Sequence, residues 1–200
     1  MKNDCVIYDF ETLGQDQKKS VVLSMAALAF TESRFLSDNP YTYEELLYSS
    51  KYIKFNAQDQ VYNYKRTIDN STLEWWTKQP AEARKALKPS SEDVLIVELY
   101  PFVMDLVNEP SKIKKVYTRG NTFDPMILQY LLEDIGKKDP FPWWSVRDTR
   151  SMIEGMSYGS DIINTFMPEG LEKVFVQHDP IHDISMDIMR LQTLARVLIL

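Results

Sequence analysis

CVIYDFE, residues 5–11, is a continuous apolar run that carries two acids, Asp9 and Glu11. A short apolar run is typical of a strand buried on both faces, as in the sheets of α/β proteins. Residues two apart on a strand point to the same face, so we expect the two carboxylates to project together. Like charges that close are unfavourable unless a cation lies between them, and ligand sets made only of oxygen favour Mg²⁺ or Mn²⁺. The alternative is a pair of surface acids at a strand end, because D-x-E pairs are common by chance.

Two longer segments after the first run are interpreted as strands. Ser20–Phe30 follows a polar, glycine-containing loop, so we expect it to pair with the first strand, although its alanines leave a helix as the alternative. The alternating segment Tyr48–Phe55 is predicted to be a third strand. Shorter runs predict two more strands, at Lys114–Arg119 and Trp144–Asp148.

Capping and stop signals predict the helices. Ser71, with Glu74 three residues later, forms a capping box that opens a helix over 71–78. Pro101 is expected to kink or break the amphipathic segment 92–107. The other predicted helices are 80–87, one capped by Asn121 or Thr122, 149–156, and 180 to about 198. This order of elements predicts an α/β protein with a mixed five-stranded sheet and helices on both faces.

The chain has 200 residues, of which 44% are hydrophobic, so residues 1–200 are expected to form a single domain. The one cysteine, Cys5, excludes an intramolecular disulfide and favours a reducing, cytoplasmic compartment. No apolar run reaches the roughly 20 residues that span a bilayer, and the first residues lack the plan of a signal peptide. We therefore expect no membrane association, and the oligomeric state stays open.

The net charge of −6 argues against a broad, sequence-independent grip on duplex DNA, which needs a basic face. It does not exclude an enzyme that holds a few nucleotides at a strand end. Such an enzyme needs only local positive charge, and metal ions can provide part of it.

Further reactive side chains follow a predicted strand or open a predicted helix. Asp124 comes shortly after Arg119, at the crevice where open α/β sheets bind ligands, but alone it is better explained as an acid that complements a helix dipole. The segment HDPIHD, residues 178–183, holds the only two histidines. Histidine accepts protons near neutral pH, although two solvated histidines on a charged helix start would give the same pattern. A zinc site has no support from a third histidine or a cysteine nearby.

Taken together, these motifs resemble the DEDDh exonucleases, whose pattern is D-x-E, a distal Asp, then H-x-A-x-x-D, on a ribonuclease H-like fold. The matching motifs are DFE at 9–11, TFD at 122–124 and HDPIHD at 178–183. Four segments are similar to the exonuclease A (DexA) type of tailed bacteriophages: TLEWW at 72–76, RGNTFDPMIL at 119–128, RDTR at 147–150 and FVQHDPIHD at 175–183. The resemblance covers nearly the whole chain, and Pro180 departs from it where the family has a small Ala.

The resemblance implies a metal-dependent 3′→5′ exonuclease that degrades single-stranded DNA from its 3′ end to nucleoside 5′-monophosphates. Two divalent cations, Mg²⁺ or Mn²⁺, would be held by Asp9, Glu11, Asp124 and Asp183. Such ions, about 3.5–4 Å apart, relieve charge on the attacking and leaving oxygens. His178 would be the general base, a task that suits an unperturbed pKa of about 6.5.

The same resemblance implies contacts with the substrate. Thr12 would lie near the terminal 3′ hydroxyl, and Trp75 and Trp76 would stack on terminal bases. Packing of the tryptophans onto the core is an equal alternative. Because neighbouring helical residues point about 100° apart, only one of the two rings is expected to face the substrate. Arg119 and Arg147 are open to contacts with phosphate or with local acids.

Three alternatives remain at this point. His182 with Asp187 forms a second His-x4-Asp frame, but we favour His178 with Asp183 because His178 precedes Pro180 and lies on the loop ahead of the helix. The substrate is equally open to being single-stranded RNA or short oligoribonucleotides, since no contact to a 2′-OH can be located. A catalytically silent nuclease fold that only binds strand ends is the third, and the five filled reactive positions argue against it.

Overall fold

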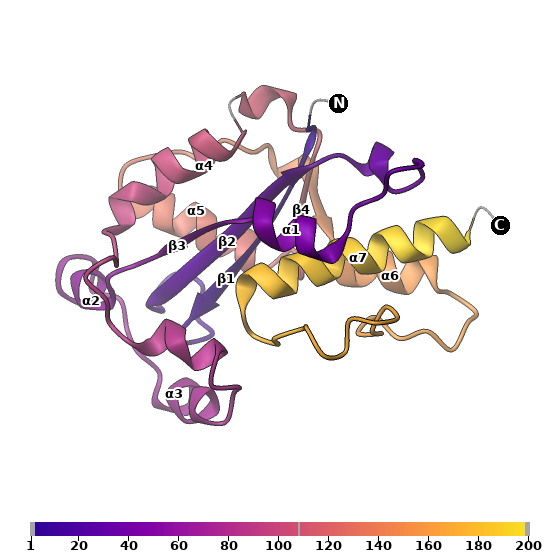
Figure 1. Ribbon diagram of the computed structural model, residues 1–200. Coiled ribbons are helices and arrows are strands. Elements are labelled where there is room, and N and C mark those ends of the chain that lie inside the picture. Colours follow the sequence, from indigo (N-terminus) through magenta and orange to yellow (C-terminus); the bar gives the residue numbers. More distant parts are fainter. Residues whose placement is uncertain (1–2, 108, 199–200) are drawn as a thin grey trace.

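β1 lies at the centre of a five-stranded sheet in the computed structural model, which describes residues 3–107 and 109–198 (Figure 1). The strand order is β3-β2-β1-β4-β5. β1 pairs antiparallel with β2 and parallel with β4, while β3 and β5 form the edges. In chain order the strands are β1 (Cys5–Thr12), β2 (Val22–Phe30), β3 (Lys51–Lys54), β4 (Lys115–Thr118) and β5 (Val146–Asp148). The predicted mixed sheet is confirmed, and the helical alternative for the second run is wrong.

Helices cover both faces of this sheet, as predicted (Figure 1). The α-helices are α1 (Tyr43–Ser49), α2 (Ala57–Tyr64), α3 (Asn70–Thr77), α4 (Leu99–Val107), α5 (Asp124–Asp134), α6 (Thr149–Met156) and α7 (Pro180–Val197). Short 3₁₀ helices cover Glu32–Arg34, Ala83–Leu87, Ile96–Glu98, Pro110–Lys112 and Trp143–Ser145. Within residues 3–107 and 109–198, no helix combines the length and apolar character needed to cross a membrane.

Alternate residues of β1 enter two separate hydrophobic cores. Val6 and Tyr8 belong to the core formed with α4 and α5. Cys5 and Ile7 belong to the core on the other face, formed with α6 and α7. Because side chains alternate between the two faces along a strand, those of Asp9 and Glu11 lie on the face that α7 covers.

A third, smaller cluster fixes α3 beside the end of β1. Its buried members are Leu13, Val21, Leu23, Trp76 and Ala83. The indole Nε1 of Trp76 donates a hydrogen bond to the carbonyl oxygen of Thr12, over 3.0 Å. The start of the loop after β1 and the C-terminal half of α3 are therefore held as one unit.

Helices α1 and α2 were not predicted: α1 overlaps the start of the predicted third strand, and α2 lies where no secondary structure was predicted. Tyr48 belongs to α1, so the third strand is shorter than predicted. The side chain of Thr42 accepts from the backbone N–H of Glu45, which is a capping signal that the prediction overlooked. Asn56 caps α2 in the same way through the N–H of Asp59. Both helices are short, so their apolar periodicity is weak and their capping residues are the stronger signal.

Other predicted boundaries also moved. Pro101 neither kinks nor breaks α4, because the helix begins at Leu99 and a proline in the first turn loses no intrahelical hydrogen bond. Asp69, rather than Ser71, caps α3. Over 80–87 only a 3₁₀ helix forms, and α5 starts after Phe123 rather than after a capping Asn or Thr side chain.

Candidate active site

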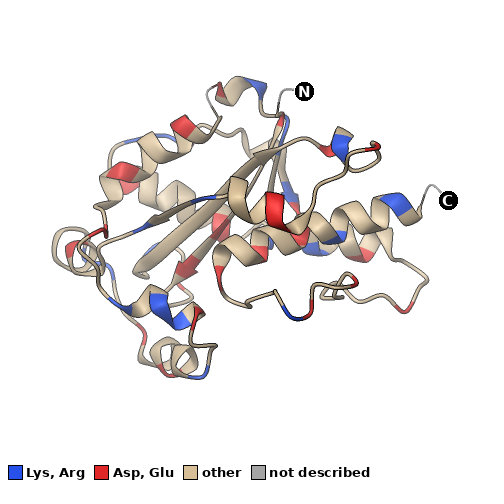
Figure 2. Ribbon diagram, in the orientation of Figure 1, with Lys and Arg blue, Asp and Glu red and all other residues tan. Residues whose placement is uncertain are grey.

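The two acids of β1, Asp9 and Glu11, lie near the C-terminal end of the strand, on the face of the sheet that α7 covers. Figure 2 shows acidic residues on the central strands beside the start of α7. Glu11 is buried and Asp9 is partly buried. A register shift between Glu11 and Thr12 ends the regular pairing with β2 at this point. The expected same-face arrangement of the two carboxylates is therefore present at an open end of the sheet.

Asp124 reaches the same place from far along the chain. It is the first residue of α5 and is only 3% exposed. Its Oδ1 accepts the backbone N–H of Phe10 over 3.1 Å, and Phe10 lies between the two acids of β1. The sequence prediction that this carboxylate joins the D-x-E pair thus agrees with the geometry.

His178 and Asp183 come from the turn that leads into α7. Asp179 caps the helix by accepting the N–H of Ile181, and Pro180 occupies its first turn. His178 adopts a left-handed backbone with φ of 63°, and its N–H donates to Asp183 Oδ2 over 3.0 Å. This hydrogen bond links the backbone of the histidine directly to the acid five residues later.

Three of the side chains form a compact group. One ligand atom each from Glu11, His178 and Asp183 lies within 4.8 Å of the other two. Asp9 and Asp124 adjoin this group as neighbouring carboxylates rather than as members of it. A carboxylate-rich cluster with one imidazole suits a divalent cation.

The cluster opens into a cavity of about 670 Å³, which we call the acidic cavity. Its walls come from β1, the end of β4, and the first turns of α5, α6 and α7, together with the segment before α7. The lining residues are Ile7, Tyr8, Asp9, Phe10, Glu11, Arg119, Phe123, Asp124, Arg150, Thr165, Met167, Phe175, Gln177, His178, Asp183, Ile184, Asp187 and Arg190. All five residues expected to act in catalysis line this one cavity.

Burial raises the pKa of each acid in the cluster, and neighbouring carboxylates raise it further for Asp9, Glu11 and Asp183. Burial raises the pKa of Asp124 to about 7, against the opposing effect of the Phe10 amide. Burial and the nearby Asp187 carboxylate raise the pKa of Asp183 to about 7. The pKa of Asp9 lies well above its usual value because of burial and then the charge of Asp124. The protein therefore holds several acids at an energetic cost that a cation would remove.

His178 is the histidine of the acidic cavity. Burial lowers the pKa of its imidazole, which favours the neutral form that can accept a proton. Its ring lies edge-on to the indole of Trp75, with ring centroids 4.6 Å apart. Trp75 is 41% exposed, so it contacts the histidine and still presents a free face.

Two residues expected to contact substrate have partners within the protein. Trp76 is completely buried, so the structure contradicts a stacking role for it and supports the packing alternative. The hydroxyl of Thr12 donates to the carbonyl oxygen of Gly14 over 2.7 Å, and Thr12 does not line the acidic cavity. The structure thus exposes the ring of Trp75 and buries that of Trp76, and contact of Trp75 with the substrate stays a prediction.

The second His-x4-Asp frame is engaged in other contacts. Nδ1 of His182 hydrogen-bonds the hydroxyl of Tyr43 over 2.9 Å and accepts the N–H of Val176 over 3.3 Å. Asp187 is buried and binds two arginines and a threonine hydroxyl. The geometry therefore favours His178 with Asp183 as the reactive frame.

The arginine partners of Asp187 include one residue that the sequence prediction missed. Arg119 Nη1 binds Asp187 Oδ1 over 2.7 Å, which is the local-acid alternative left open for it. Arg190 Nη1 binds the same oxygen over 2.9 Å, and its spacing of three from Asp187 on α7 was the available signal. Arg147 donates to the carbonyl oxygens of Trp144 and Val146, rather than to an acid.

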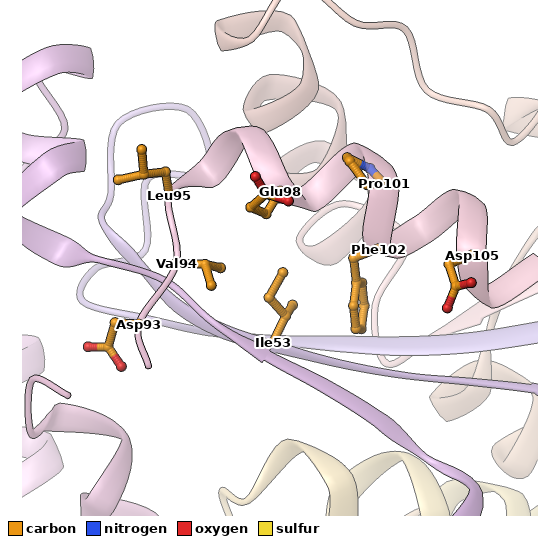
Figure 3. Close-up of a pocket in the computed structure, with 8 residues that line it drawn as sticks. All are labelled: Ile53, Asp93, Val94, Leu95, Glu98, Pro101, Phe102 and Asp105. Atoms are coloured by element: carbon orange, nitrogen blue, oxygen red, sulfur yellow. The ribbon is translucent and has the colours of Figure 1, made fainter. Parts of the chain in front are cut away.

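A second cavity, of about 620 Å³, lies between β3 and α4 (Figure 3). Ile53 and Phe102 point into it, with Asp93 and Asp105 at its two ends. Lys54 binds Asp93 over 2.7 Å, and another lysine of β3 binds Asp105. Its lining contains no histidine, and two of its three acids are paired with lysines, so it lacks the combination of unpaired acids and a histidine that the acidic cavity has.

Comparisons with known proteins agree with this geometry. The family model for the 3′-5′ exoribonuclease Rv2179c-like domain matches residues 4–194. A protein of Enterobacteria phage T4 described as an exodeoxyribonuclease is 33% identical over 207 residues, which cover 95% of this chain and 88% of the relative.

Solved structures share the fold at low identity. A zinc-bound E. coli Exonuclease I complex with single-stranded DNA superposes with a TM-score of 0.59 at 18% identity, covering 99% of this chain and 40% of that protein. E. coli Exonuclease I with a dT13 oligonucleotide gives a TM-score of 0.58 at 16% identity, covering 99% and 41%. This chain thus spans about two fifths of the length of those proteins. With the family model and the phage relative, the chain belongs to the Rv2179c-like family of 3′-5′ exoribonuclease domains, and it is a 3′→5′ exonuclease with a ribonuclease H-like fold.

Proposed function

We propose that this protein hydrolyses single-stranded DNA from the 3′ end and releases nucleoside 5′-monophosphates, using two divalent cations, Mg²⁺ or Mn²⁺. The observation that carries the proposal is the meeting of Asp9, Glu11, Asp124, His178 and Asp183 at one cavity. DNA is favoured over RNA because the phage T4 relative is described as an exodeoxyribonuclease and the Exonuclease I neighbours bind single-stranded DNA.

The donor set fits the cations. Asp9, Glu11, Asp124 and Asp183 offer carboxylate oxygens, which are the ligands that Mg²⁺ and Mn²⁺ prefer. Their pKa values are raised because burial disfavours the ionised carboxylates, which a bound cation would stabilise. When bound, the ions would supply charge relief on the scissile phosphate and an activated water. The hydrogen bond from Phe10 N–H keeps the Asp124 carboxylate beside the strand, where it can share in binding.

The remaining residues would position and activate the reactants. His178 would accept the proton of the attacking water, for which its neutral imidazole is suited. Trp75 would stack a terminal base on its exposed face. Thr12, the last residue of β1, would lie near the 3′ hydroxyl, while its own hydroxyl and carbonyl oxygen are bound to Gly14 and Trp76.

The decisive experiment uses matched single strands of DNA and RNA, each labelled at the 5′ end in one set and at the 3′ end in another. With Mn²⁺ or Mg²⁺, the 5′-labelled DNA should shorten stepwise, and the 3′-labelled DNA should release labelled mononucleotide at once. EDTA and Asp9→Asn should both stop the reaction. Release of internal fragments, or shortening from the 5′ end, would contradict the proposed polarity.

A second candidate substrate is single-stranded RNA, which the description of the matched family favours. The same assay decides between them through the ratio of kcat/KM for DNA and RNA of one sequence. A ratio well above one supports the DNA proposal. A ratio well below one would make the protein an exoribonuclease with the same site.

We further propose that residues 1–200 act as a single exonuclease domain in the cytoplasm. The five strands form one sheet, and residues from β1, α5, α6, α7 and the segment before α7 line one cavity at it, which supports the first part. The lone buried Cys5 is in keeping with a reducing compartment.

A further inference from the structure

The acidic cavity contains three arginines, and two of them are occupied. Arg119 and Arg190 both bind Oδ1 of Asp187, which is buried. Arg119 also donates to the carbonyl and side-chain oxygens of Asn164 over 3.1 and 2.9 Å. Arg190 donates to the carbonyl oxygen of Phe166 over 2.8 Å. These two guanidinium groups therefore hold the walls of the cavity together and have little freedom to bind a ligand.

Arg150 is the third, and none of the described residues pairs with its charge. It lies in the first turn of α6, where its backbone N–H donates to Asp148 Oδ1 over 3.0 Å. Its side chain makes no hydrogen bond or ion pair with any of the residues in 3–107 and 109–198, although the residue is exposed and lines the acidic cavity. Its neighbour Thr149 is buried and hydrogen-bonds Asp187, so the turn that carries Arg150 is fixed against α7.

We propose that Arg150 binds a backbone phosphate of the DNA strand, next to the phosphate that is cleaved. The proposal rests on the proposed function, because it takes the acid cluster as the place of cleavage. A single strand brings one negative charge per nucleotide, and only the cleaved phosphate can occupy the cluster. The next phosphate then meets a cavity wall whose free cation is Arg150. A guanidinium suits this task, since its planar fork gives two parallel hydrogen bonds to phosphate oxygens.

The negative net charge of the protein means that DNA binding depends on a small number of local cations. At −6, the molecule repels a polyanion at long range. Binding of a strand end must therefore come from a few local cations, and Arg150 is the one that the acidic cavity leaves unpaired among the described residues. Arg150 thereby becomes a substrate-binding residue, distinct from the general base and from the acids.

The test compares Arg150→Gln with Arg150→Lys and with Lys114→Gln as the matched control. Lys114 is an exposed cation just before β4, at the end of the sheet opposite the acid cluster, and it pairs with Asp4. Lys114→Gln therefore removes the same unit charge away from the cavity. Binding of a 5′-fluorescein-labelled thymidine oligonucleotide is measured by anisotropy in Ca²⁺, with the labelled strand checked to stay intact, between about 50 and 200 mM salt.

For Arg150→Gln we expect the dissociation constant to rise about tenfold, since a charge-assisted hydrogen bond is lost. The slope of log K against log salt should become shallower by about 0.7, the value for one phosphate contact on a single strand. Arg150→Lys should keep the slope and lose part of the affinity. In turnover assays, KM for the oligonucleotide should rise more than KM for the p-nitrophenyl ester of thymidine 5′-monophosphate, which has no second phosphate.

A slope and dissociation constant for Arg150→Gln equal to those of Lys114→Gln would overturn the proposal. So would equal increases of KM for the oligonucleotide and for the monophosphate ester. Failure of the proposed function looks different, because the wild-type protein itself would then release no mononucleotide from either substrate. Because the Arg150 side chain has no partner among the residues that the structure describes, its replacement should leave Tm unchanged, and a large fall in Tm would also count against the proposal.

Discussion

His178 and His182 lie four residues apart, yet they face different surroundings. His178 adjoins Glu11 and Asp183 at the acidic cavity, whereas His182 turns to the hydroxyl of Tyr43 and the amide of Val176. A proline between them starts α7 and separates the loop from the helix. The two imidazoles are therefore expected to respond differently to the same substitution.

His178→Ala should reduce kcat by about 10²–10⁴-fold, the usual contribution of a general base, and should leave divalent-ion binding largely intact. His182→Ala should have a much smaller effect on kcat and should lower stability by about 1 kcal/mol, because Tyr43 and Val176 lose a partly buried hydrogen-bond acceptor. The measurements are kcat at saturating Mn²⁺, calorimetric ion binding and urea unfolding. The reverse ranking in kcat would move the reactive frame to His182 and Asp187.

Trp75 and Trp76 give a second contrast between neighbours. Trp76→Ala should lower the free energy of unfolding by about 3–5 kcal/mol, because it empties a fully buried site. Trp75→Ala should change stability little and should weaken single-strand binding by about 1–3 kcal/mol, the range for one stacked base. Trp75→Phe, which keeps an aromatic face, should recover most of the binding. Equal losses of stability in both alanine variants would show that Trp75 is a packing residue instead.

At the scale of elements, one buried carboxylate ties four segments together. Asp187 of α7 binds Arg119 after β4, Thr149 at the start of α6, and Arg190 one turn along its own helix. The two arginines extend these contacts to the carbonyl oxygens of residues 164–166. The network fixes the wall of the cavity that faces the acid cluster, and it explains why Asp187 differs from Asp183 despite sharing a helix face.

Asp187→Asn and Asp183→Asn should therefore act in opposite ways on the metal-free protein. Asp187→Asn leaves two partly or fully buried arginines without their carboxylate and should destabilise by about 3–5 kcal/mol. Asp183→Asn removes a repelled buried acid, so stability in EDTA should rise, while divalent-ion affinity should fall. Urea unfolding in EDTA and calorimetric ion binding measure the two effects. A stable Asp187→Asn variant with intact turnover would remove the structural role given to this acid.

At the scale of the whole molecule, the acid cluster makes stability depend on pH and on ions. The pKa values of Asp124 and Asp183 are raised to about 7 by burial, against about 4 in the unfolded chain. The native state therefore binds more protons than the unfolded state between these values. The stability that these groups contribute is fully present below pH 4 and is lost as pH rises towards 7.

In EDTA, Tm should accordingly fall as pH rises from about 4 to about 7 because of this cluster. Mg²⁺ or Mn²⁺ should restore it most strongly near neutral pH, since the ions bind the ionised native site. Asp124→Asn should flatten the fall in EDTA and weaken the recovery by ions. Each kcal/mol regained corresponds to about 2–4 °C in Tm for a chain of this size. A Tm in EDTA that rises across this window, in parallel for wild type and Asp124→Asn, would contradict the explanation.

Local patterns were enough to predict much of the fold and the identity of the cluster. The apolar run of β1 with its D-x-E pair, the long run of β2, and the proline start of α7 each lie within one segment, so the sequence shows them directly. Helix α6 matched its predicted bounds for the same reason. The short helices α1 and α2 were not predicted, because seven or eight residues show little apolar periodicity. Their capping residues were the only signal in the sequence.

The sequence by itself determined which reactive groups make up the cluster that we propose as the active site, namely an acid pair on a central strand, a distal acid, and a histidine and an acid at the start of the last helix. Only the tertiary structure decided which of two residues close together in the sequence is buried or paired and which is exposed at the cavity. It buried Trp76 and exposed Trp75, bound His182 to Tyr43, and paired Asp187 with Arg119 and Arg190, whereas Arg150 pairs with no residue of the described part of the chain. The physical reason is range: periodicity and capping act within a few residues, whereas burial and charge pairing depend on segments that meet only after folding.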